Sequence, residues 1–312
     1  LHDLTPAGLT RHATLGEIWV IGTPPVACLF LTPRPGALYL GKLAVAASHR
    51  GTGLARQLLA LAETRARALH LPALELQTRI ELTRNHAIFR ALGFTETGRT
   101  AHPGYDRPTS ITFRRPLPMI DPTTAAWLNP PPDWQLADSL SLTTAPKTDF
   151  WRDTLYGFRR ASGHAFLAAA PADFTLHLTF QGDYQALYDQ AGLLLWQDEG
   201  HWLKAGVELS DGVANLSVVV TDGASDWSTQ PLAGAAGSQR LRLTRRDKAV
   251  VVQVRNPANR WQLLRVAPFP AGPARIGPMA CSPEGPGFAA RFTEFRLGPP
   301  VAQPLHDESP AD

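Results

Sequence analysis

Cysteine is scarce in this sequence, which has only Cys28 and Cys281 among its 312 residues. Two cysteines so far apart in the chain match neither a metal-binding spacing nor a disulfide framework, and we expect no metal. Apolar runs such as Val26 to Leu31 and Ala165 to Pro171 fall well below the ~20 residues of a membrane-spanning helix. The formal net charge of +3 is small, which argues against nucleic acid or a membrane surface as a partner. We therefore expect a cytoplasmic protein.

Apolar and turn-forming residues are, by contrast, abundant. Hydrophobic residues make up 44% of the chain, with 13 Phe and 8 Trp, and this composition excludes a mainly disordered protein. The length suits about two domains, and 25 Gly with 28 Pro predict many turns. The chain opens on Leu1-His2-Asp3-Leu4 without an initiator Met or an apolar signal segment, so we expect an N-terminal truncation.

A proline-rich stretch separates two parts with different hydrophobic periods. It contains Pro116-Leu117-Pro118 and Asn129-Pro130-Pro131-Pro132 and predicts a linker over 117–132. Residues 1–116 alternate strand and helix signals, with helical spacing over Leu54 to Leu69, and predict an α+β domain. Residues 133–299 predict an all-β sandwich or jelly roll, and the polar tail 300–312 is expected to be disordered. The strand-like segments of the second part include Phe174 to Phe180, Ala191 to Trp196, His201 to Leu209, Asn215 to Thr221, Gln239 to Arg245, Ala249 to Val254, Trp261 to Ala267 and Phe288 to Leu297.

The sharpest local signal is an apolar strand that runs through a glycine turn directly into a helix. The strand end Leu43 to Ala47 is followed by the turn Ser48 to Gly53, and helical spacing begins at the next residue. Gly51 and Gly53 allow backbone amides to approach a phosphate, and the N-terminus of the helix adds its dipole. The segment therefore predicts an anion cradle, to which Arg50 adds a positive charge.

Two motifs in this part resemble the GNAT family of N-acetyltransferases. Arg50, Gly53 and Ala55 take the defining positions of that family's acetyl-CoA signature. Asn85 to Phe94 resembles its second motif, in which an Asn opens a helix that Leu-Gly-Phe closes. The resemblance covers roughly residues 10–116 and implies acetyl-CoA as substrate and an amine as acceptor, with the Val45 amide polarising the thioester carbonyl. The residues it implies in acetyl-CoA binding are Leu43, Val45, Arg50, Gly51, Thr52, Gly53, Leu54, Ala55 and Asn85.

The sequence departs from this family in the groups that move protons. Phe89 stands where many members carry an acidic Tyr, so Tyr105 is the alternative acid for the leaving thiolate. Glu81, Glu75 or water is the candidate base for the amine, although Glu81 also fits a solvated loop charge. Too few residues precede position 17 for the strand and two helices with which the family helps to build its acceptor pocket. We predict that His49 and His86 lie at the surface. We predict that Phe89 and Phe94 lie in the core.

In the second part, strand alternation places polar and aromatic side chains together on one face. Over His201 to Leu209 the apolar residues point one way and Trp202, Lys204 and Glu208 the other, and Gln190 to Trp196 alternates likewise. Because an aromatic ring stacks on a sugar while polar groups bind its hydroxyls, this face predicts a surface for carbohydrate or a similar polar ligand. The alternative is packing of the Trp side chains under a loop, with an ion pair between Lys204 and Glu208. The predicted ligand-binding residues are Gln190, Trp196, Trp202, Lys204 and Glu208.

Several segments of the second part are similar to a regulation-of-enolase-like family with a concanavalin A-like jelly roll. They include Tyr188 to Gly192, Trp202 to Glu208 and Ser225 to Ser228, and the resemblance covers roughly 133–298. It implies the fold and no activity. No Glu-x-Asp-x-x-Glu-like spacing is present, so hydrolysis of glycosides is not expected. A solvated strand face and turn are predicted for Arg240, Arg242, Arg245 and Arg246.

The two resemblances together predict an N-acetyltransferase that uses acetyl-CoA, joined to a jelly roll that binds carbohydrate or another polar ligand. The alternative is a degenerate, non-catalytic CoA-binding or scaffold module with a structural or protein-interaction jelly roll. The missing acidic Tyr and the short N-terminal segment favour this alternative.

Overall fold

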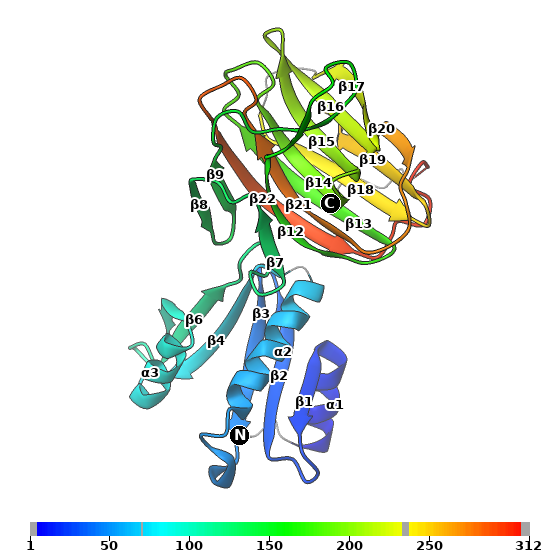
Figure 1. The fold of residues 1–312 in the computed structure, drawn as a ribbon. Coiled ribbons are helices and arrows are strands. Elements are labelled where there is room, and N and C mark those ends of the chain that lie inside the picture. Colours follow the sequence, from blue (N-terminus) through cyan, green and yellow to red (C-terminus); the bar gives the residue numbers. More distant parts are fainter. Residues whose placement is uncertain (1–4, 70, 233–236, 307–312) are drawn as a thin grey trace. The chain divides into compact units, whose positions relative to one another are not determined.

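The computed structural model describes residues 5–69, 71–232 and 237–306. The chain forms two compact units, residues 1–117 and residues 118–312. The first is α+β and the second an all-β sandwich, so the predicted fold class is confirmed. All α-helices of the described residues lie in the first unit (Figure 1).

The first unit is built on a six-stranded mixed sheet. Its elements are α1 (Pro6–Leu15), β1 (Glu17–Ile21), β2 (Ala27–Arg34), β3 (Ala37–Val45), a short 3-10 turn (Ala47–His49), α2 (Leu54–Ala68), β4 (Ala73–Arg79), α3 (Thr83–Ala91), β5 (Thr95–Thr100) and β6 (Ser110–Pro116). The strand order is β1-β2-β3-β4-β6-β5, with β3 and β4 parallel and the other neighbours antiparallel. Because its apolar residues recur at helical spacing, α2 buries one face against β2, β3 and β4.

Helix α1 was not predicted from the sequence. The Thr5 side chain caps it by accepting a hydrogen bond from the Gly8 amide (3.1 Å), and Pro6 occupies its first turn. Gly8 is the single buried residue of the helix. The apolar period by which a helix is identified from sequence is therefore nearly absent here, and only the start signals remain.

The second unit consists of two seven-stranded antiparallel sheets and a short hairpin. One sheet, called here the β14 sheet, has the order β17-β16-β15-β14-β21-β12-β7, and its strands are β7 (Ala125–Leu128), β12 (His164–Ala170), β14 (Gln190–Asp198), β15 (His201–Ser210), β16 (Val213–Asp222), β17 (Ala224–Pro231) and β21 (Ala274–Cys281). The other, the β13 sheet, has the order β20-β19-β18-β13-β22-β9-β8, and its strands are β8 (Asp133–Leu136), β9 (Leu140–Thr143), β13 (Phe174–Gly182), β18 (Gln239–Arg246), β19 (Ala249–Arg255), β20 (Trp261–Pro268) and β22 (Ala289–Gly298). The hairpin pairs β10 (Phe150–Arg152) with β11 (Arg159–Ala161).

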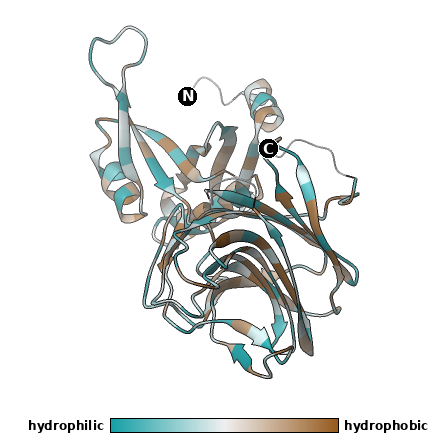
Figure 2. Cartoon of the chain, turned by 90° about the horizontal axis from the view of Figure 1, so that it is seen from above, coloured by the Kyte–Doolittle hydropathy of each residue, from teal (hydrophilic) through white to brown (hydrophobic). Residues whose placement is uncertain are grey.

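The sandwich has a core between its sheets and a second apolar cluster on the outer face of the β14 sheet. Leu193, Leu195 and Leu203 face the core, opposite residues such as Leu176 and Leu243 of the β13 sheet. Figure 2 shows apolar residues along the strands of both sheets. The second cluster forms because the hairpin segment folds over the outer face and covers it, and its buried members are Phe150, Ala165, Leu167, Leu194, Trp196, Trp202, Val219, Met279 and Cys281.

Two segments expected to lie outside the sandwich belong to it. Within the predicted linker 117–132, Ile120 is buried in the core and β7 pairs with β12, because this stretch carries enough apolar residues to complete a sheet edge. In the tail, the Val301 amide donates to Thr175 Oγ1 (2.9 Å), and the Pro304 carbonyl accepts from Gln253 Nε2 (2.8 Å). The predicted disorder is therefore wrong for 300–306, and residues 307–312 lie outside the described residues.

Three residues predicted at the surface are buried. The His86 ring lies inside the first unit, where Nε2 is 2.8 Å from the Arg79 carbonyl oxygen. Arg242 and Arg245 are 2% and 1% exposed, since the fold supplies acceptors for both guanidinium groups. The acceptors are Gln253 Oε1 for Arg242 and the carbonyls of Pro270 and Gly272 for Arg245. His49 is exposed as predicted, and the predicted core positions are confirmed for Phe89, which packs on the core of the first unit, and Phe94.

Candidate functional site

Strands β3 and β4 pair at one end of the sheet and separate at the other. Their parallel pairing is limited to Leu38 with Leu74 and Tyr39 with Glu75. Beyond that point β3 stays paired with β2 as far as Val45, while β4 stays paired with β6. The backbone edge of β3 therefore opens toward a gap between the strands (Figure 1), as the sequence resemblance implied.

The turn after β3 has the geometry of an anion cradle. Gly51 and Gly53 adopt φ of +83° and +89°, a left-handed conformation that favours glycine, and a Cβ at either would meet no atom within 4 Å. Thr52 Oγ1 tightens the turn by donating to the His49 carbonyl (2.7 Å). Gly53 is the N-cap of α2, and no side chain of the described residues caps the amides of the first helical turn. The turn thus brings together the predicted cofactor-binding residues Arg50, Gly51, Thr52, Gly53, Leu54 and Ala55 at the end of the strand that carries Leu43 and Val45.

The Val45 amide faces the gap between β3 and β4. The next amide, that of Ala46, donates to the Val26 carbonyl on the β2 side (2.8 Å). Since successive amides of a strand point to opposite edges, the Val45 N–H is directed away from β2. A register shift opposite Lys42, whose φ is +52°, bends β3 just before this point. The strand therefore presents a hydrogen-bond donor toward the gap between β3 and β4.

The candidate acid and base lie at the same end of the sheet but make no contact with each other among the described residues. Glu81 is exposed in the turn between β4 and α3, and Asn85 lies in the first turn of α3. Tyr105 is 59% exposed in the loop between β5 and β6. The other candidate base, Glu75, is held by Arg34 and Arg114 at 3.5 and 3.6 Å.

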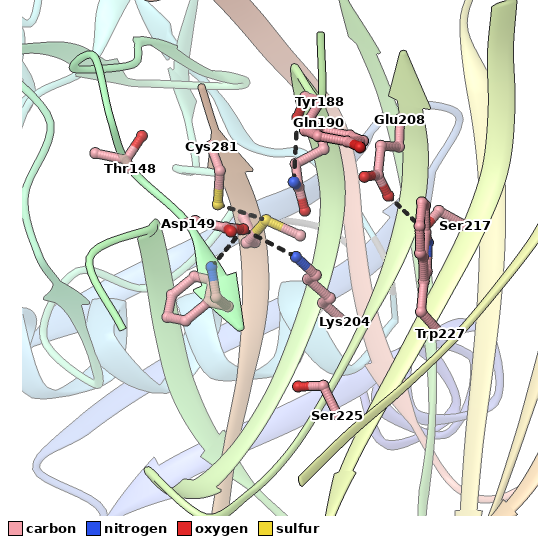
Figure 3. A network of polar contacts seen from close by, with 12 residues as sticks. Thr148, Asp149, Tyr188, Gln190, Lys204, Glu208, Ser217, Ser225, Trp227 and Cys281 are labelled. Carbon is pink, nitrogen blue, oxygen red and sulfur yellow. Dashed lines mark hydrogen bonds and ion pairs between the residues drawn. The ribbon is translucent and has the colours of Figure 1, made fainter. Parts of the chain in front are cut away.

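A pocket of about 300 Å³ opens on the outer face of the β14 sheet, beside the hairpin. Its floor holds side chains that are nine-tenths or more buried, from β14, β15 and the segment before β10 (Figure 3). Aromatic rings form its walls. The lining consists of Asp149, Gln190, Lys204 and Glu208 at the floor and of Trp151, Tyr156, Phe158, Arg160, Tyr188, Val219, Trp227, Pro283 and Glu284 around it.

A buried ion pair lies at the centre of the floor. Lys204 Nζ is 3.2 Å from Asp149 Oδ1, which also accepts a hydrogen bond from the Phe150 amide (2.8 Å). Burial lowers the pKa of Lys204, but the carboxylates of Asp149 and Glu208 outweigh it and raise that pKa above its ordinary value. Lys204 therefore remains charged at 4% exposure, because Asp149 compensates its desolvation.

Glu208 is tied to the aromatic wall through a hydroxyl. The Ser217 hydroxyl donates to Glu208 Oε2 (2.6 Å) and accepts from the Trp227 indole N–H (3.0 Å). Burial raises the pKa of Glu208, against the opposing effects of Lys204 and Ser217. The floor of the pocket therefore holds the Lys204 cation, its partner Asp149, and Glu208, whose carboxyl group is harder to ionise than usual.

The raised pKa of Glu208 predicts a measurable pH dependence. A carboxyl whose folded-state pKa lies above its unfolded value contributes stability below that unfolded value of 4.5, and this is lost as the pH rises through the folded-state pKa. We expect Glu208→Gln to lose less unfolding free energy than the wild type as the pH rises above 4.5. Urea titrations of both proteins at several pH values measure this difference. Parallel pH profiles would show that Glu208 titrates normally.

The predicted ligand-binding residues share one face of the sheet, but only Gln190, Lys204 and Glu208 of them line the pocket. The strand register places Gln190 opposite Glu208 and Trp196 opposite Trp202 on one face. However, both tryptophans are buried under Phe150, with ring centroids 5.8 and 6.0 Å away, so neither reaches the pocket. The predicted alternative of packing under a loop holds for this pair.

The residues that sequence reasoning missed come from segments without a regular period. Asp149 and Trp151 belong to the hairpin segment, and Asp149 takes the place that Glu208 was expected to have as the partner of Lys204. Tyr188 precedes β14, and Trp227 lies on the edge strand β17. Tyr188 and Trp227 lie in segments that resemble the regulation-of-enolase-like family, but alternation along a single strand does not show which segments fold over it.

The described part of the chain contains no group of three or more His, Cys, Asp or Glu side chains arranged to hold a metal ion. Among the same residues, no helix has the length and apolar character needed to cross a membrane.

Two different family models match the two units of the chain. The family model described as "Protein of unknown function (DUF1349)" matches residues 127–300, and that of the "Acetyltransferase (GNAT) family" matches residues 7–94. "Regulation of enolase protein 1" of Saccharomyces cerevisiae is 46% identical over 185 residues, which are 59% of this chain and 93% of the relative.

Two solved structures are similar to parts of this chain. A crystal structure of a functionally unknown protein from Saccharomyces cerevisiae has a TM-score of 0.56 and 45% identity, and covers 58% of this chain and 98% of its own. A GNAT family acetyltransferase from Elizabethkingia anophelis with acetyl-CoA bound has a TM-score of 0.31 and 18% identity, and covers 37% of this chain and 85% of its own.

Proposed function

Since this chain belongs to the DUF1349 family through residues 127–300 and also carries a GNAT acetyltransferase domain, we propose that it transfers an acetyl group from acetyl-CoA to a primary amine. The observation that carries this proposal is the open edge of β3 leading into the glycine turn and α2. This edge and turn match the two ends of the substrate, an extended pantetheine arm and a pyrophosphate.

In the proposed complex, the amides of Gly51 to Ala55 bind the pyrophosphate, with the charge of Arg50 and the α2 dipole favouring its negative charge. The free edge of β3 from Leu43 pairs with the pantetheine arm, while the Val45 amide donates to the acetyl carbonyl oxygen. Glu81, through water, first takes one proton from the substrate ammonium, so that the neutral amine nitrogen attacks the acetyl carbon and the carbon–sulfur bond breaks. The leaving thiolate takes a proton from Tyr105, and the second proton of the new amide nitrogen passes to the Tyr105 oxygen.

Both proton-transfer groups act from the solvent side in this proposal. Tyr105 lies in an exposed loop and Glu81 in an exposed turn, so neither is desolvated before substrate binds. Binding must therefore bring them to the acyl group. A non-catalytic CoA-binding module remains the competing function, since it needs only the cradle and the open strand edge.

One assay separates acetyl transfer from CoA binding alone. The full chain is titrated calorimetrically with acetyl-CoA, and release of the CoA thiol is then followed with spermidine, lysine, a lysine peptide and an aminoglycoside as acceptors. We expect saturable binding, and thiol release that depends on at least one amine. Binding without amine-dependent release from any acceptor would support the non-catalytic module, and absence of binding would contradict both functions.

A second function is proposed for the second unit, the binding of a carbohydrate or similar polar ligand. The observation that favours it is the pocket of about 300 Å³ with aromatic walls over a buried polar floor. Burial of ionic groups lowers the stability of the folded protein. We therefore infer that these groups are present because a ligand binds to them. Because Trp151 and Trp227 line the pocket, tryptophan fluorescence reports binding there.

A further inference from the structure

Resting on the carbohydrate binding proposed above, we infer that the second unit binds at least two units of a neutral saccharide. The terminal unit lies in the pocket over Lys204 and Glu208. The next unit lies in an adjoining hollow beyond Trp151 and Trp227, which no predicted ligand-binding residue lines. The inference adds a second subsite and a charge preference to the proposed function.

The floor of the pocket has hydrogen-bonding capacity that the protein does not use. Within the described part of the chain, Asp149 is the one acceptor contacted by the Lys204 ammonium, which has three N–H groups. Glu208 accepts from Ser217 through Oε2, and the Trp227 indole N–H also lies near this carboxyl group, whose four lone-pair positions exceed these two donors. Gln190 donates one N–H to the Tyr188 carbonyl (3.1 Å), and its amide oxygen is left as an acceptor. Figure 3 shows these donor and acceptor groups close together on the floor of the pocket. Adjacent hydroxyls of a saccharide, each a donor and an acceptor, match such a combination.

The charges around the pocket favour a neutral ligand. At the floor, the Lys204 cation lies against Asp149 and near Glu208, and nearer the surface Arg160 and Glu284 also have opposite charges. A saccharide carboxylate in the pocket would be desolvated beside two carboxyl groups, and an ammonium would be desolvated beside Lys204. Either charge would have to be buried with no uncompensated opposite charge beside it, which is unfavourable.

The hollow beyond the aromatic wall supplies the second subsite. It has a volume of about 390 Å³ and shares Trp151, Tyr156 and Trp227 with the pocket, so the two are neighbours across these rings. The Trp151 ring stands edge to face against Trp227 at 6.3 Å and against Tyr156 at 6.1 Å. The rings therefore present apolar surface to both spaces. The remaining lining of the hollow consists of Thr154, Leu155, Ser225 and Asp226.

Two side chains report on the two spaces separately. Glu208 lines the pocket and not the hollow, whereas Asp226 lines the hollow and not the pocket. Asp226 is largely exposed and pairs with Arg265 at 2.5 Å, so its replacement leaves the buried floor intact. Glu199 is exposed, lines neither space, and provides a matched control.

The experiment applies the full chain to an array of neutral, amino and acidic oligosaccharides of one to six units. The one-, two- and three-unit members of the strongest series are then titrated by tryptophan fluorescence. We expect a neutral oligosaccharide series to bind most strongly. Its affinity should be about tenfold or more higher for two units than for one, which is the scale of an added aromatic contact. Asp226→Ala should weaken binding of two and three units and leave one unit unchanged, Glu208→Gln should weaken all three, and Glu199→Ala none.

Each result separates the inference from the function on which it rests. Equal affinity for one and two units would overturn the second subsite while carbohydrate binding stands. A preference for acidic or amino sugars would overturn the neutral assignment. No response to any glycan would contradict carbohydrate binding itself. If Glu208→Gln fails to fold, the gain from one to two units in the wild type still decides the second subsite.

Discussion

Gly53→Glu is expected to abolish acetyl-CoA binding. Gly53 caps α2 at φ +89°, with open space where its Cβ would lie, and the added carboxylate would occupy the place of the pyrophosphate. Like charges in contact cost several kcal/mol, so the Kd should rise about 100-fold or more. Isothermal titration with acetyl-CoA measures the change.

The matched control for this variant is Gly36→Glu. Gly36 also adopts a left-handed φ, +74°, but lies in the turn between β2 and β3, at the other end of β3 from the cradle. The Gly36→Glu variant therefore introduces the same charge and similar backbone strain without touching the proposed site. Equal loss of binding in both variants would point to general damage, and unchanged affinity in Gly53→Glu would remove the cradle from the proposal.

Lys204→Met is expected to destabilise the second unit more than any surface substitution. The change leaves the Asp149 carboxylate buried, 8% exposed, with the Phe150 amide as its described donor. Breaking a buried ion pair by removing one partner costs about 3–5 kcal/mol of unfolding free energy. Urea denaturation of the full chain, followed by tryptophan fluorescence, measures the loss.

A double-mutant cycle shows whether the loss comes from the ion pair. Asp149→Asn removes the charge that Lys204→Met leaves behind, so the double variant should be more stable than the sum of the single losses by about 1–3 kcal/mol. The exposed pair of Arg265 with Asp226 is the comparison, and Arg265→Met should cost about 1 kcal/mol or less. Additive losses in the cycle would mean that Lys204 stabilises by packing alone.

Local patterns of the sequence predicted the elements on which both candidate sites are built. The order of strand, glycine turn and helix at residues 43–55 was sufficient for the cradle, because it depends on backbone conformation within one short segment. Alternation along β14 and β15 likewise placed Gln190, Lys204 and Glu208 on one face, since the side-chain period of a strand is fixed. The acid and base of the first site, Tyr105 and Glu81, stay predictions.

Exposure of that face was decided only in the tertiary structure. Trp196 and Trp202 follow the same alternation as Lys204, yet Phe150 covers them and the pocket opens beside them. The partner of Lys204 is 55 residues away in the chain, and Trp227 reaches Glu208 through Ser217 on a neighbouring strand.

The amino-acid sequence by itself determined which segments form strands, helices and turns, and which side of each strand is polar. The tertiary structure alone decided which polar side meets a cavity and which is covered. The reason is physical: backbone conformation and alternation depend on neighbouring residues, whereas burial depends on segments such as 145–161 that carry no period and fold over a sheet assembled from distant strands.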